Sequence, residues 1–422
     1  MVSYSVWHTF RNVPWLNFAL FVVLASIPFY NYLNRYALIL FVGTAVFTGA
    51  LKTKKKHLSG DYLWVFSALY FLIIAASVLW DPNGIDAFKS VEKNASFLII
   101  APLIASLQQL KTTVLKACFL IFVCSTSLVC FLCLYLAWTE YQSVGDYRVF
   151  YYQYLAAQMD LNAIYLSLYS ATSIIILLYY YFIRPNTSSR LTLFAVLLLC
   201  AMLCFMVMLL SSKMILAVLC LLIVVTALYI GYLKKFLWQG LLFIILFMVG
   251  GGYLLWQMPY VKWRVQVTLL KDYENKEDDQ NGLAVRKRIW QHSAELIKEK
   301  PLLGYGIMAG NEELIKKYEE TKFKFAAQNK YNCHNLYLQL LINTGIVGLL
   351  PLIIVLFWCL LTAIKRRSYL FCCFMVLFLG LSITESLLEV QKGIVFVVVF
   401  LFLLYYHPLE VVIEKQPDFK AS

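Results

Sequence analysis

The feature of this sequence that most constrains its fold is the recurrence of long apolar runs along nearly its whole length. Hydrophobic residues make up 62% and charged residues only 14% of the 422 positions, whereas a soluble domain carries about 25% charged residues. The mean hydropathy is +0.73. Runs of this kind cross a bilayer as helices, whereas a transmembrane barrel would show alternating strands of about ten residues. The sequence therefore predicts an all-α polytopic membrane protein.

Basic clusters between the apolar runs indicate the number and direction of the spans. With the N-terminus inside, the clusters at 52–56, 111–116, 184–190, 234–235 and 365–367 all fall on the cytoplasmic side, as the positive-inside rule requires. These clusters account for much of the net charge of +13, so the charge does not indicate nucleic acid as a partner. The register holds for about twelve spans. The expected spans are Leu16–Phe29, Tyr36–Leu51, Tyr62–Trp80, Ala95–Leu107, Cys118–Trp138, Asn162–Phe182, Leu191–Leu210, Met214–Tyr232, Leu241–Met258, Leu336–Ile364, Tyr369–Leu388 and Gly393–Tyr406.

The register divides the chain into three parts. Residues 1–258 hold the first nine expected spans, residues 259–333 form one large external loop, and residues 334–422 hold the last three spans and a tail. The loop contains most of the long polar stretch of the sequence. Its composition predicts a helix over Ala284–Lys300 that stops at Pro301, with Asp278, Asp279 and Asn281 as N-cap candidates. A second helix is expected from Asn311, so the loop is predicted to be folded.

The residues that suggest chemistry gather in and beside this loop. His334 lies where the loop meets the next span, and histidine can take and return a proton near neutral pH. Nearby cations would favour its neutral form, ready to act as a base. Arg286 and Trp290 share one helix face, while Arg288 points about 200° away from Arg286. Because the planar guanidinium group binds two phosphate oxygens at once, this combination indicates a lipid-linked diphosphate as substrate.

Each of these residues also has a plainer interpretation. His334 alone would be an interfacial or structural histidine, and Arg286 and Arg288 alone would be part of a solvated helix face. Lys213 would reach from a span end toward water, and Arg148 alone indicates little. The carboxylates Glu385 and Glu389 near the end of a span are more informative, because charges near membrane depth are costly and are functional or paired. They would bind an acceptor or form salt bridges with Lys213 or an arginine.

The motif pattern resembles the O-antigen ligase and O-antigen polymerase family. It consists of R-x-x-x-W, then P-L-x-G-x-G, a polar segment, and finally H-N-x-Y-L-Q and G-x-x-G-L, over about residues 280 to 350. The residues that carry it are Arg286, Trp290, Pro301, Gly304, Gly306, His334, Asn335, Tyr337, Leu338, Gln339, Gly345, Gly348 and Leu349. The stretch from Glu385 through Glu389 and Gln391 to Gly393 looks like a feature of some members.

The resemblance implies a GT-C-like helical fold and an inverting glycosyl transfer from an undecaprenyl diphosphate-linked glycan. It implies no metal, no other cofactor and no nucleotide sugar. Within it, His334 and Arg286 correspond to the catalytic candidates. Lys213 stands where the family commonly has an arginine, and it retains the charge without the bidentate geometry. We expect Lys213, Arg288 and Arg148 to bind the diphosphate.

We expect the remaining candidates to support this site, namely Asn335, Trp290, Glu385 and Glu389.

Three functions remain open at this stage. A ligase would pass the glycan to a lipid A-core-like lipid or another glycan or protein acceptor, in lipopolysaccharide biosynthesis. A polymerase would extend the glycan on its carrier with the same donor chemistry. A transporter or flippase of lipid-linked sugars would also use basic residues and intramembrane carboxylates, but transporters often show inverted repeats and broken helices. The register places the site on the periplasmic face of a bacterial inner membrane, among membrane lipids.

Overall fold

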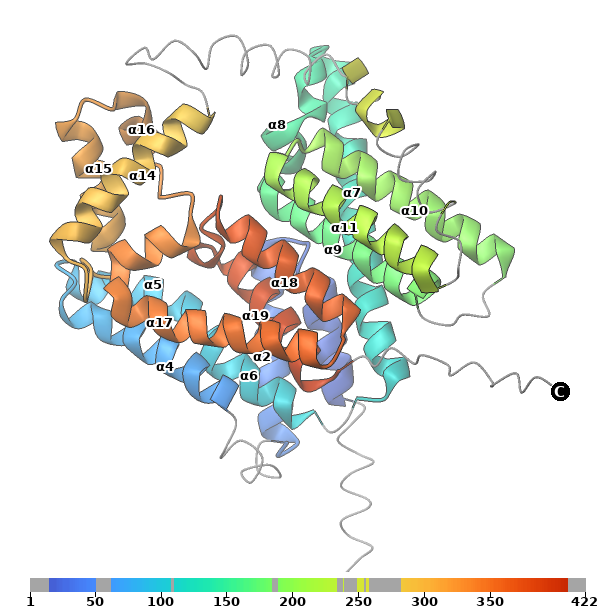
Figure 1. Ribbon diagram of the computed structural model, residues 1–422, viewed down its shortest axis with the longest axis horizontal. Coiled ribbons are helices and arrows are strands. Elements are labelled where there is room, and N and C mark those ends of the chain that lie inside the picture. Colours follow the sequence, from blue (N-terminus) through green and yellow to red (C-terminus); the bar gives the residue numbers. More distant parts are fainter. Residues whose placement is uncertain are drawn as a thin grey trace, which may run out of the picture.

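The computed structural model describes residues 15–50, 62–107, 110–183, 189–233, 238, 249–253, 256–257 and 282–408, and within these ranges every regular element is a helix. Figure 1 shows them in one bundle. The helices are Trp15–Ser26, α2 Asn31–Phe47, α4 Tyr62–Ala76, α5 Phe88–Asn94, α6 Ser96–Ser106, α7 Thr112–Val144, α8 Tyr152–Ala157, α9 Ala163–Leu178, α10 Arg190–Leu209, α11 Lys213–Leu233, α14 Gly282–Glu299, α15 Ala309–Glu320, α16 Lys324–Gln328, α17 Leu336–Lys365, α18 Tyr369–Ser382 and α19 Gln391–Tyr406.

The all-α polytopic membrane fold is confirmed. Six helices in the described ranges are long and apolar enough to cross a membrane, and four shorter apolar helices accompany them. Helix α6 has 11 residues, so it is only about 16 Å long and shorter than the expected fourth span. The ninth expected span lies largely outside the described residues. The eleventh ends early, because α18 stops at Ser382 and leaves Glu385 and Glu389 in the connection to α19.

Helix α19 is the buried centre of the bundle. Its side chains from Lys392 to Leu404 are buried. Helices α6, α17 and α18 pack against it, and Tyr169 on α9 contacts the ring of Phe396. Phe396 and Phe400 contact the rings of Phe122 on α7 and Phe374 on α18 at centroid distances of 4.9 to 5.9 Å. Such edge and offset ring contacts stabilise a core beyond simple burial. The start of α19 is thus fixed relative to α18 and α9.

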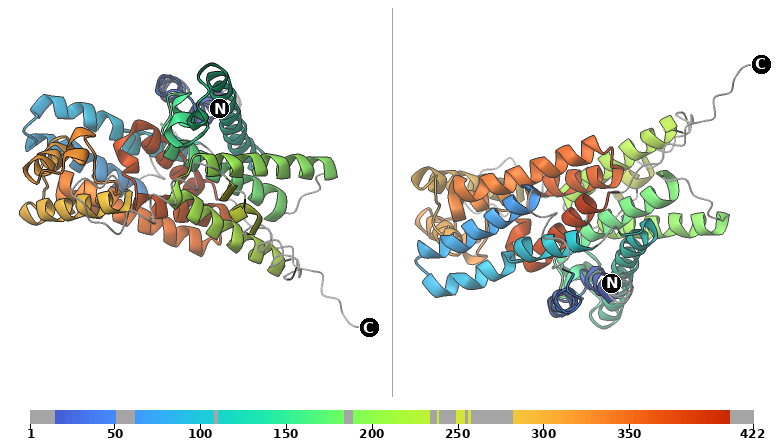
Figure 2. Two further views of the ribbon diagram at one scale, coloured as in Figure 1. Left: turned by 90° about the horizontal axis from the view of Figure 1, so that it is seen from above. Right: turned by 90° about the horizontal axis from the view of Figure 1, so that it is seen from below.

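The large loop forms a small helical unit at one end of the molecule. Figure 2 shows α14, α15 and α16 at the opposite end of the long axis from α10 and α11. The predicted helix over Ala284–Lys300 is confirmed as α14, and the second begins at Ala309, close to the expected Asn311. The N-cap candidates Asp278, Asp279 and Asn281 lie outside the described residues. The unit has its own core, which includes Ile289, Leu314 and Tyr318.

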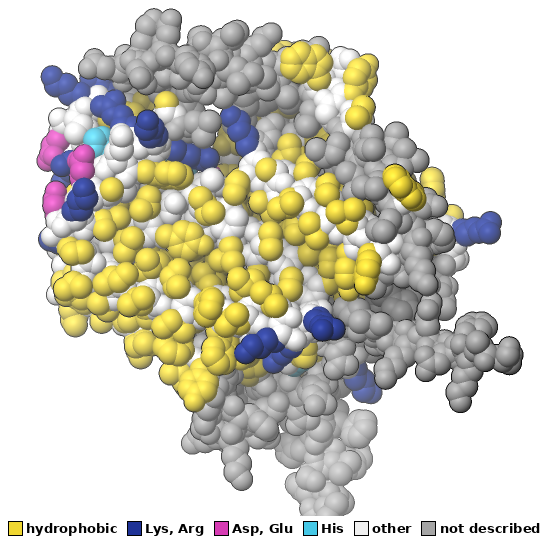
Figure 3. Space-filling model, viewed as in Figure 1, with side chains coloured by type: hydrophobic (Ala, Val, Ile, Leu, Met, Phe, Trp, Pro, Cys, Tyr) yellow, Lys and Arg dark blue, Asp and Glu magenta, His cyan; other side chains and the backbone are white. Residues whose placement is uncertain are grey.

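The surface has the polarity of a membrane protein. On the face in Figure 3, hydrophobic side chains cover the middle, while Lys and Arg gather at the edge over α14–α16 and at the lower edge. Large apolar side chains such as Phe47, Leu79 and Leu191 are exposed. In a soluble protein a continuous apolar face of this kind is rare, and in a bilayer it faces the lipid tails.

The turn that follows α14 docks against a break in α17. Gly345 has φ 61° and ψ −163° inside α17, so the helix loses its regular hydrogen bonds there. The main chain of the turn replaces them, with Tyr305 N donating to Ile342 O at 2.8 Å and Ile346 N donating to Pro301 O at 2.9 Å. A side chain at Gly304, where φ is +66°, would collide with Ile342 O. The motif glycines therefore allow two backbones to pair closely.

The turn after α4 attaches to the same unit. Asp81 is buried, and its Oδ2 accepts hydrogen bonds from Met308 N at 2.7 Å and Ala309 N at 3.1 Å. This carboxylate thereby caps the N-terminus of α15 from a distant part of the sequence. Trp80 Nε1 donates to Leu303 O at 3.1 Å. The loop unit is thus held by α17 on one side and by the α4 turn on the other.

Candidate active site

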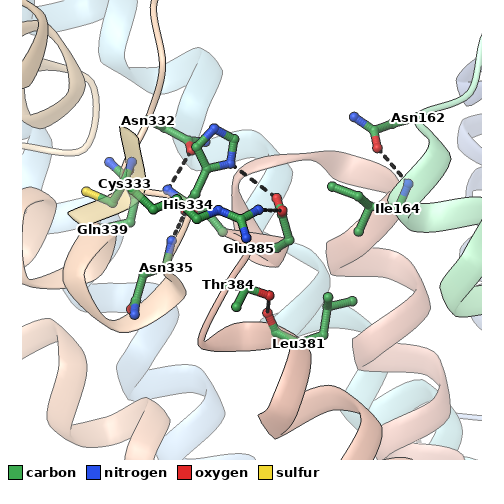
Figure 4. A network of polar contacts seen from close by, with 12 residues as sticks. Asn162, Ile164, Asn332, Cys333, His334, Asn335, Gln339, Leu381, Thr384 and Glu385 are labelled. Carbon is green, nitrogen blue, oxygen red and sulfur yellow. Dashed lines mark hydrogen bonds and ion pairs between the residues drawn. The ribbon is translucent and has the colours of Figure 1, made fainter. Parts of the chain in front are cut away.

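Glu385 connects the two residues that the sequence singles out most strongly. Its Oε1 accepts a hydrogen bond from Arg286 Nη2 at 2.8 Å, and its Oε2 lies 3.3 Å from His334 Nδ1. The side chains of Glu385, His334 and Arg286 are 13%, 28% and 32% exposed. Because partial burial limits screening by water, such a charge pair is stronger than a surface pair. Figure 4 shows His334 and Glu385 pointing toward one another from separate segments.

The backbone around His334 is shaped to present the imidazole. His334 has φ 44°, a left-handed conformation that is uncommon for a residue with a side chain and that often occurs at functional sites. Its main-chain N donates to Asn332 Oδ1 at 3.0 Å. The ring packs edge-on against Tyr331 at a centroid distance of 5.3 Å. With the proton on Nδ1, the ring donates to Glu385 and leaves Nε2 as an acceptor.

Asn335 fixes the histidine segment to the start of α17 and to the turn that carries Glu385. Its Oδ1 accepts from Tyr337 N and Leu338 N at 3.0 Å each, as an N-cap does. Its Nδ2 donates to Ile383 O at 2.9 Å, and its main-chain N donates to Ser386 Oγ at 3.2 Å. Asn335 is therefore a positioning residue that sets the distance between His334 and Glu385.

Helix α14 supplies the third wall of the site. Trp290 lies one turn after Arg286, and its Nε1 donates to Cys333 O at 3.0 Å. This contact holds α14 against the residue that precedes His334. The shared face that the sequence predicts for Arg286 and Trp290 agrees with these contacts, because Arg286 bonds Glu385, the partner of His334, while Trp290 bonds Cys333, the residue before His334. The supporting position of Trp290 follows from this bond.

A second polar network runs from Cys333 into the first turns of α17. Gln339 Oε1 accepts from Cys333 N at 3.0 Å, Gln339 Nε2 donates to Asn343 Oδ1 at 3.1 Å, and Asn343 Nδ2 donates to Glu389 Oε1 at 3.2 Å. Gln339 and Asn343 are fully buried. Glu389 lies in the connection between α18 and α19. Burial raises the pKa of Glu389 to about 7, although the charge of Lys93 and the hydrogen bond from Asn343 act to lower it. This network joins the histidine segment to the break in α17.

Lys213 approaches from another part of the bundle. Helix α11 runs antiparallel to α18, because Thr226 and Tyr369 are hydrogen-bonded at one end while Met214 and Val218 lie beside Gly380 at the other. The exposed Lys213 begins α11 and so lies toward the end of α18 from which the Glu385 turn leaves. The two other expected cations have different neighbours.

Arg288 and Arg148 are not brought to Glu385. Arg288 Nη2 donates to Thr321 O at 3.0 Å, and its guanidinium lies 4.4 Å from the centre of the Phe323 ring, inside the loop unit. Arg148 pairs with Asp146 at 2.7 Å, with 63% of its side chain exposed. Arg288 therefore has a packing role, as its opposite direction from Arg286 indicates. Arg148 is part of an exposed turn before α8.

Comparison with known families agrees with this geometry. Residues 197–353 match the family model described as O-antigen ligase. This part of the chain is similar to the O-antigen ligase family. The match spans α10, α11, the loop unit and the first part of α17, and it contains Lys213, Arg286 and His334. No curated protein sequence matches the chain.

Two aspects of the candidate site differ from expectation. The charged group in contact with the imidazole is the anion Glu385, whereas the sequence suggested cations. Glu385 and Glu389 also have separate partners, and of the open alternatives the ion pair with an arginine is the one observed for Glu385. Sequence reasoning missed Asp81 and Asn343. The signal for Asn343 was present, because Gln339 and Asn343 stand four residues apart on one face of an apolar helix.

Proposed function

We propose that the chain is an inverting glycosyltransferase that moves a glycan from an undecaprenyl diphosphate carrier to an acceptor hydroxyl, as an O-antigen ligase. The observation that carries the proposal is the bridge by which Glu385 holds Arg286 and His334 together. The bridge places an always-charged phosphate-binding group beside a group that can accept a proton, at the junction of a membrane bundle and a polar loop. The family match supports glycosyl transfer of the ligase or polymerase type.

The donor side of the reaction needs stabilisation of negative charge. As the bond between the anomeric carbon and the diphosphate breaks, its electron pair leaves with the diphosphate oxygen. Arg286 stabilises this growing charge with the donor hydrogens that Glu385 does not use, and Lys213 adds a second positive charge. Fixed donors of this kind are effective because they need no reorganisation during the reaction. The donor set requires no metal ion in this scheme.

The acceptor side needs a base. His334 Nε2 takes the proton of the acceptor hydroxyl while the hydroxyl oxygen forms its bond to the anomeric carbon from the side opposite the leaving diphosphate. One displacement of this kind inverts the configuration at that carbon. Glu385 holds Nδ1–H and stabilises the imidazolium that results, which is the role of the carboxylate in other histidine–carboxylate pairs.

Two alternatives share parts of this site. A polymerase uses the same donor chemistry, so loss of the gene distinguishes the two, with unattached long chains for a ligase and single repeat units for a polymerase. A transporter would suit the broken α17, which the sequence did not predict. The backbone groups freed at Gly345, however, are paired with the turn Pro301–Gly306, so the break serves to dock the loop unit.

The proposed site faces the periplasm of a bacterial inner membrane, as the charge register requires. Transfer by the purified protein, with a synthetic undecaprenyl diphosphate-linked glycan and acceptor-containing membranes, tests the activity. His334→Ala should fold normally and lose transfer by about 100-fold or more. Arg286→Lys should also lose most transfer, because lysine lacks the planar fork. Full activity of His334→Ala would refute the assignment of the base.

A further inference from the structure

A buried ammonium group lies at the start of the central helix, and the mechanism above gives it no role. Lys392 is only 5% exposed and is the second residue of α19. Its Nζ donates a hydrogen bond to the main-chain oxygen of Asp160 at 3.3 Å. Within the described ranges it forms no ion pair with a carboxylate.

This position is unfavourable for a cation in the chain alone. Burying an ammonium group without a paired anion costs several kcal/mol. The N-terminal end of a helix carries a partial positive charge, which adds to the cost for a lysine in the first turn. One carbonyl oxygen compensates little of this. A bound anion would compensate both the burial of the ammonium and its position at the helix N-terminus. The residues around Lys392 indicate which anion could reach it.

The surroundings belong to the candidate active site. Gly393 lies so close to Tyr165 on α9 that a side chain there would come within 2.8 Å of the Tyr165 ring. The Tyr165 phenol is within electrostatic reach of both Glu385 and Glu389. Figure 4 draws Asn162, at the N-terminus of α9, across from His334 and Glu385. The starts of α9 and α19 thus border the same region as the Glu385 turn.

The charges already present do not neutralise Lys392. Glu385 is engaged by Arg286 and His334, and Glu389 is held by Asn343. The carboxylate of Asp160 acts on Lys392 electrostatically, but Asp160 is exposed, so water screens this interaction. A diphosphate carries more than one negative charge and is bound by several cations from different directions.

We propose that Lys392 is a further diphosphate-binding residue, which contacts the phosphate groups of the lipid-linked donor from the α19 side while Arg286 contacts them from α14. This proposal rests on the proposed function, since it names a residue for the same donor. A lysine suits this role because its ammonium is a point charge on a flexible stem and needs no fixed planar geometry. The competing explanation is structural, with Lys392 serving only to fasten the Asp160 turn to α19.

Binding of undecaprenyl diphosphate to the purified full-length protein separates these explanations without requiring glycan transfer. Lys392→Met removes the charge and keeps an apolar stem in a buried site. It should weaken undecaprenyl diphosphate binding about tenfold or more, with unchanged or raised thermal stability. Lys392→Arg should retain most of the binding. The matched control is Lys89→Met, which removes an 83% exposed lysine that pairs with Asp86 and should bind as the wild type does.

Ligand controls identify the group that Lys392 recognises. Undecaprenol lacks the phosphates, so its weaker binding should not change in Lys392→Met. Inorganic pyrophosphate and phosphatidylglycerol vesicles test the free anion and a general anionic lipid, and stronger competition by either one than by the carrier would overturn the assignment to the carrier. If Lys392→Met does not fold, Lys392→Gln keeps a donor for the Asp160 carbonyl and gives the same comparison.

The outcomes are distinct. Equal binding of undecaprenyl diphosphate by the wild type and the neutral variant would overturn the role of Lys392 while leaving the proposed function intact. Absence of binding by the wild type would overturn the proposed function, and the role of Lys392 with it. Lower thermal stability together with unchanged binding would assign Lys392 to the structural role.

Discussion

Two polar networks lie where the loop unit meets the bundle. We call the one around Glu385 the upper network and the one around Asn343 the lower network, and they differ in how accessible their side chains are to a ligand. In the upper network, Glu385 holds Arg286 and His334, whose side chains remain about one third exposed. In the lower network, Asn343 is hydrogen-bonded to both Gln339 and Glu389, and Gln339 and Asn343 are buried while Glu389 is half-buried. Arg286 and His334 therefore remain partly accessible to a ligand, whereas Gln339 and Asn343 form their hydrogen bonds within the protein.

The difference indicates which motif residues serve the chemistry and which serve the structure. The histidine and the first arginine are available for chemistry. The asparagine, the glutamine and the glycines fix the backbone that carries them, through the α17 cap, the buried network and the paired turn. A change in the upper network should therefore affect transfer without unfolding the protein, and a change in the lower one should affect stability first.

The largest expected effect is on transfer in the upper network. Glu385→Gln keeps the size of the side chain but removes the charge that fixes the imidazole and the guanidinium. We expect glycan transfer to fall by about 100-fold to 10,000-fold, with a melting temperature close to that of the wild type. Glu313→Gln, which removes a carboxylate that pairs with Lys316 on α15, is the matched control. Near-normal transfer by Glu385→Gln would mean that the bridge is structural.

The next effect concerns the lower network and its helix break. Gly345→Ala adds a side chain at φ 61° against the Leu302 carbonyl, so the turn and α17 cannot pair as they do. We expect a loss of at least about 3 kcal/mol in stability, measured as a lower melting temperature in detergent. Gly43→Ala is the control, because a side chain at Gly43 in α2 meets nothing within 4 Å. Equal melting temperatures for the two variants would contradict the docking role of the break.

The carboxylate of Glu389 predicts a pH dependence of stability. The pKa of Glu389 is raised from 4.5 to about 7 in the folded chain, so the folded state holds this proton more tightly than the unfolded state. Its contribution is present below about pH 4.5 and is lost as the pH rises through 7, by up to about 3 kcal/mol. Melting temperatures at pH 5 to 8 should fall less steeply for Glu389→Gln than for the wild type. Parallel curves would show that Glu389 does not titrate in this range.

The smallest effect separates two arginines on one helix. Arg288→Lys loses the contact with the Phe323 ring and the fixed bond to Thr321 O, which costs about 1 kcal/mol of stability. Transfer should stay within about threefold of the wild type, whereas Arg286→Lys should lose most of it. Comparable transfer losses in the two variants would place Arg288 in the donor site.

The fold and the outline of the site follow from patterns that the sequence displays directly. Apolar runs predict the helices, and the motif spacing identifies Arg286 and His334 as candidate site residues. The position of Glu385 could not be predicted, because Glu385 lies 51 positions after His334, and the intervening chain includes all of α17 and α18, whose packing sets the distance. The break at Gly345 was hidden for a related reason. A glycine in an apolar helix is common, and only the docking turn shows why this one leaves the helix.

The central claim is that Glu385 and His334 act as one unit, and a double-mutant cycle tests it most directly. Glycan transfer is measured for the wild type, Glu385→Gln, His334→Gln and the double variant, with equal amounts of folded protein. If the carboxylate acts through the imidazole, the double variant transfers no more slowly than the slower single variant. Losses that multiply in the double variant would mean that the two residues act independently, and would contradict the account.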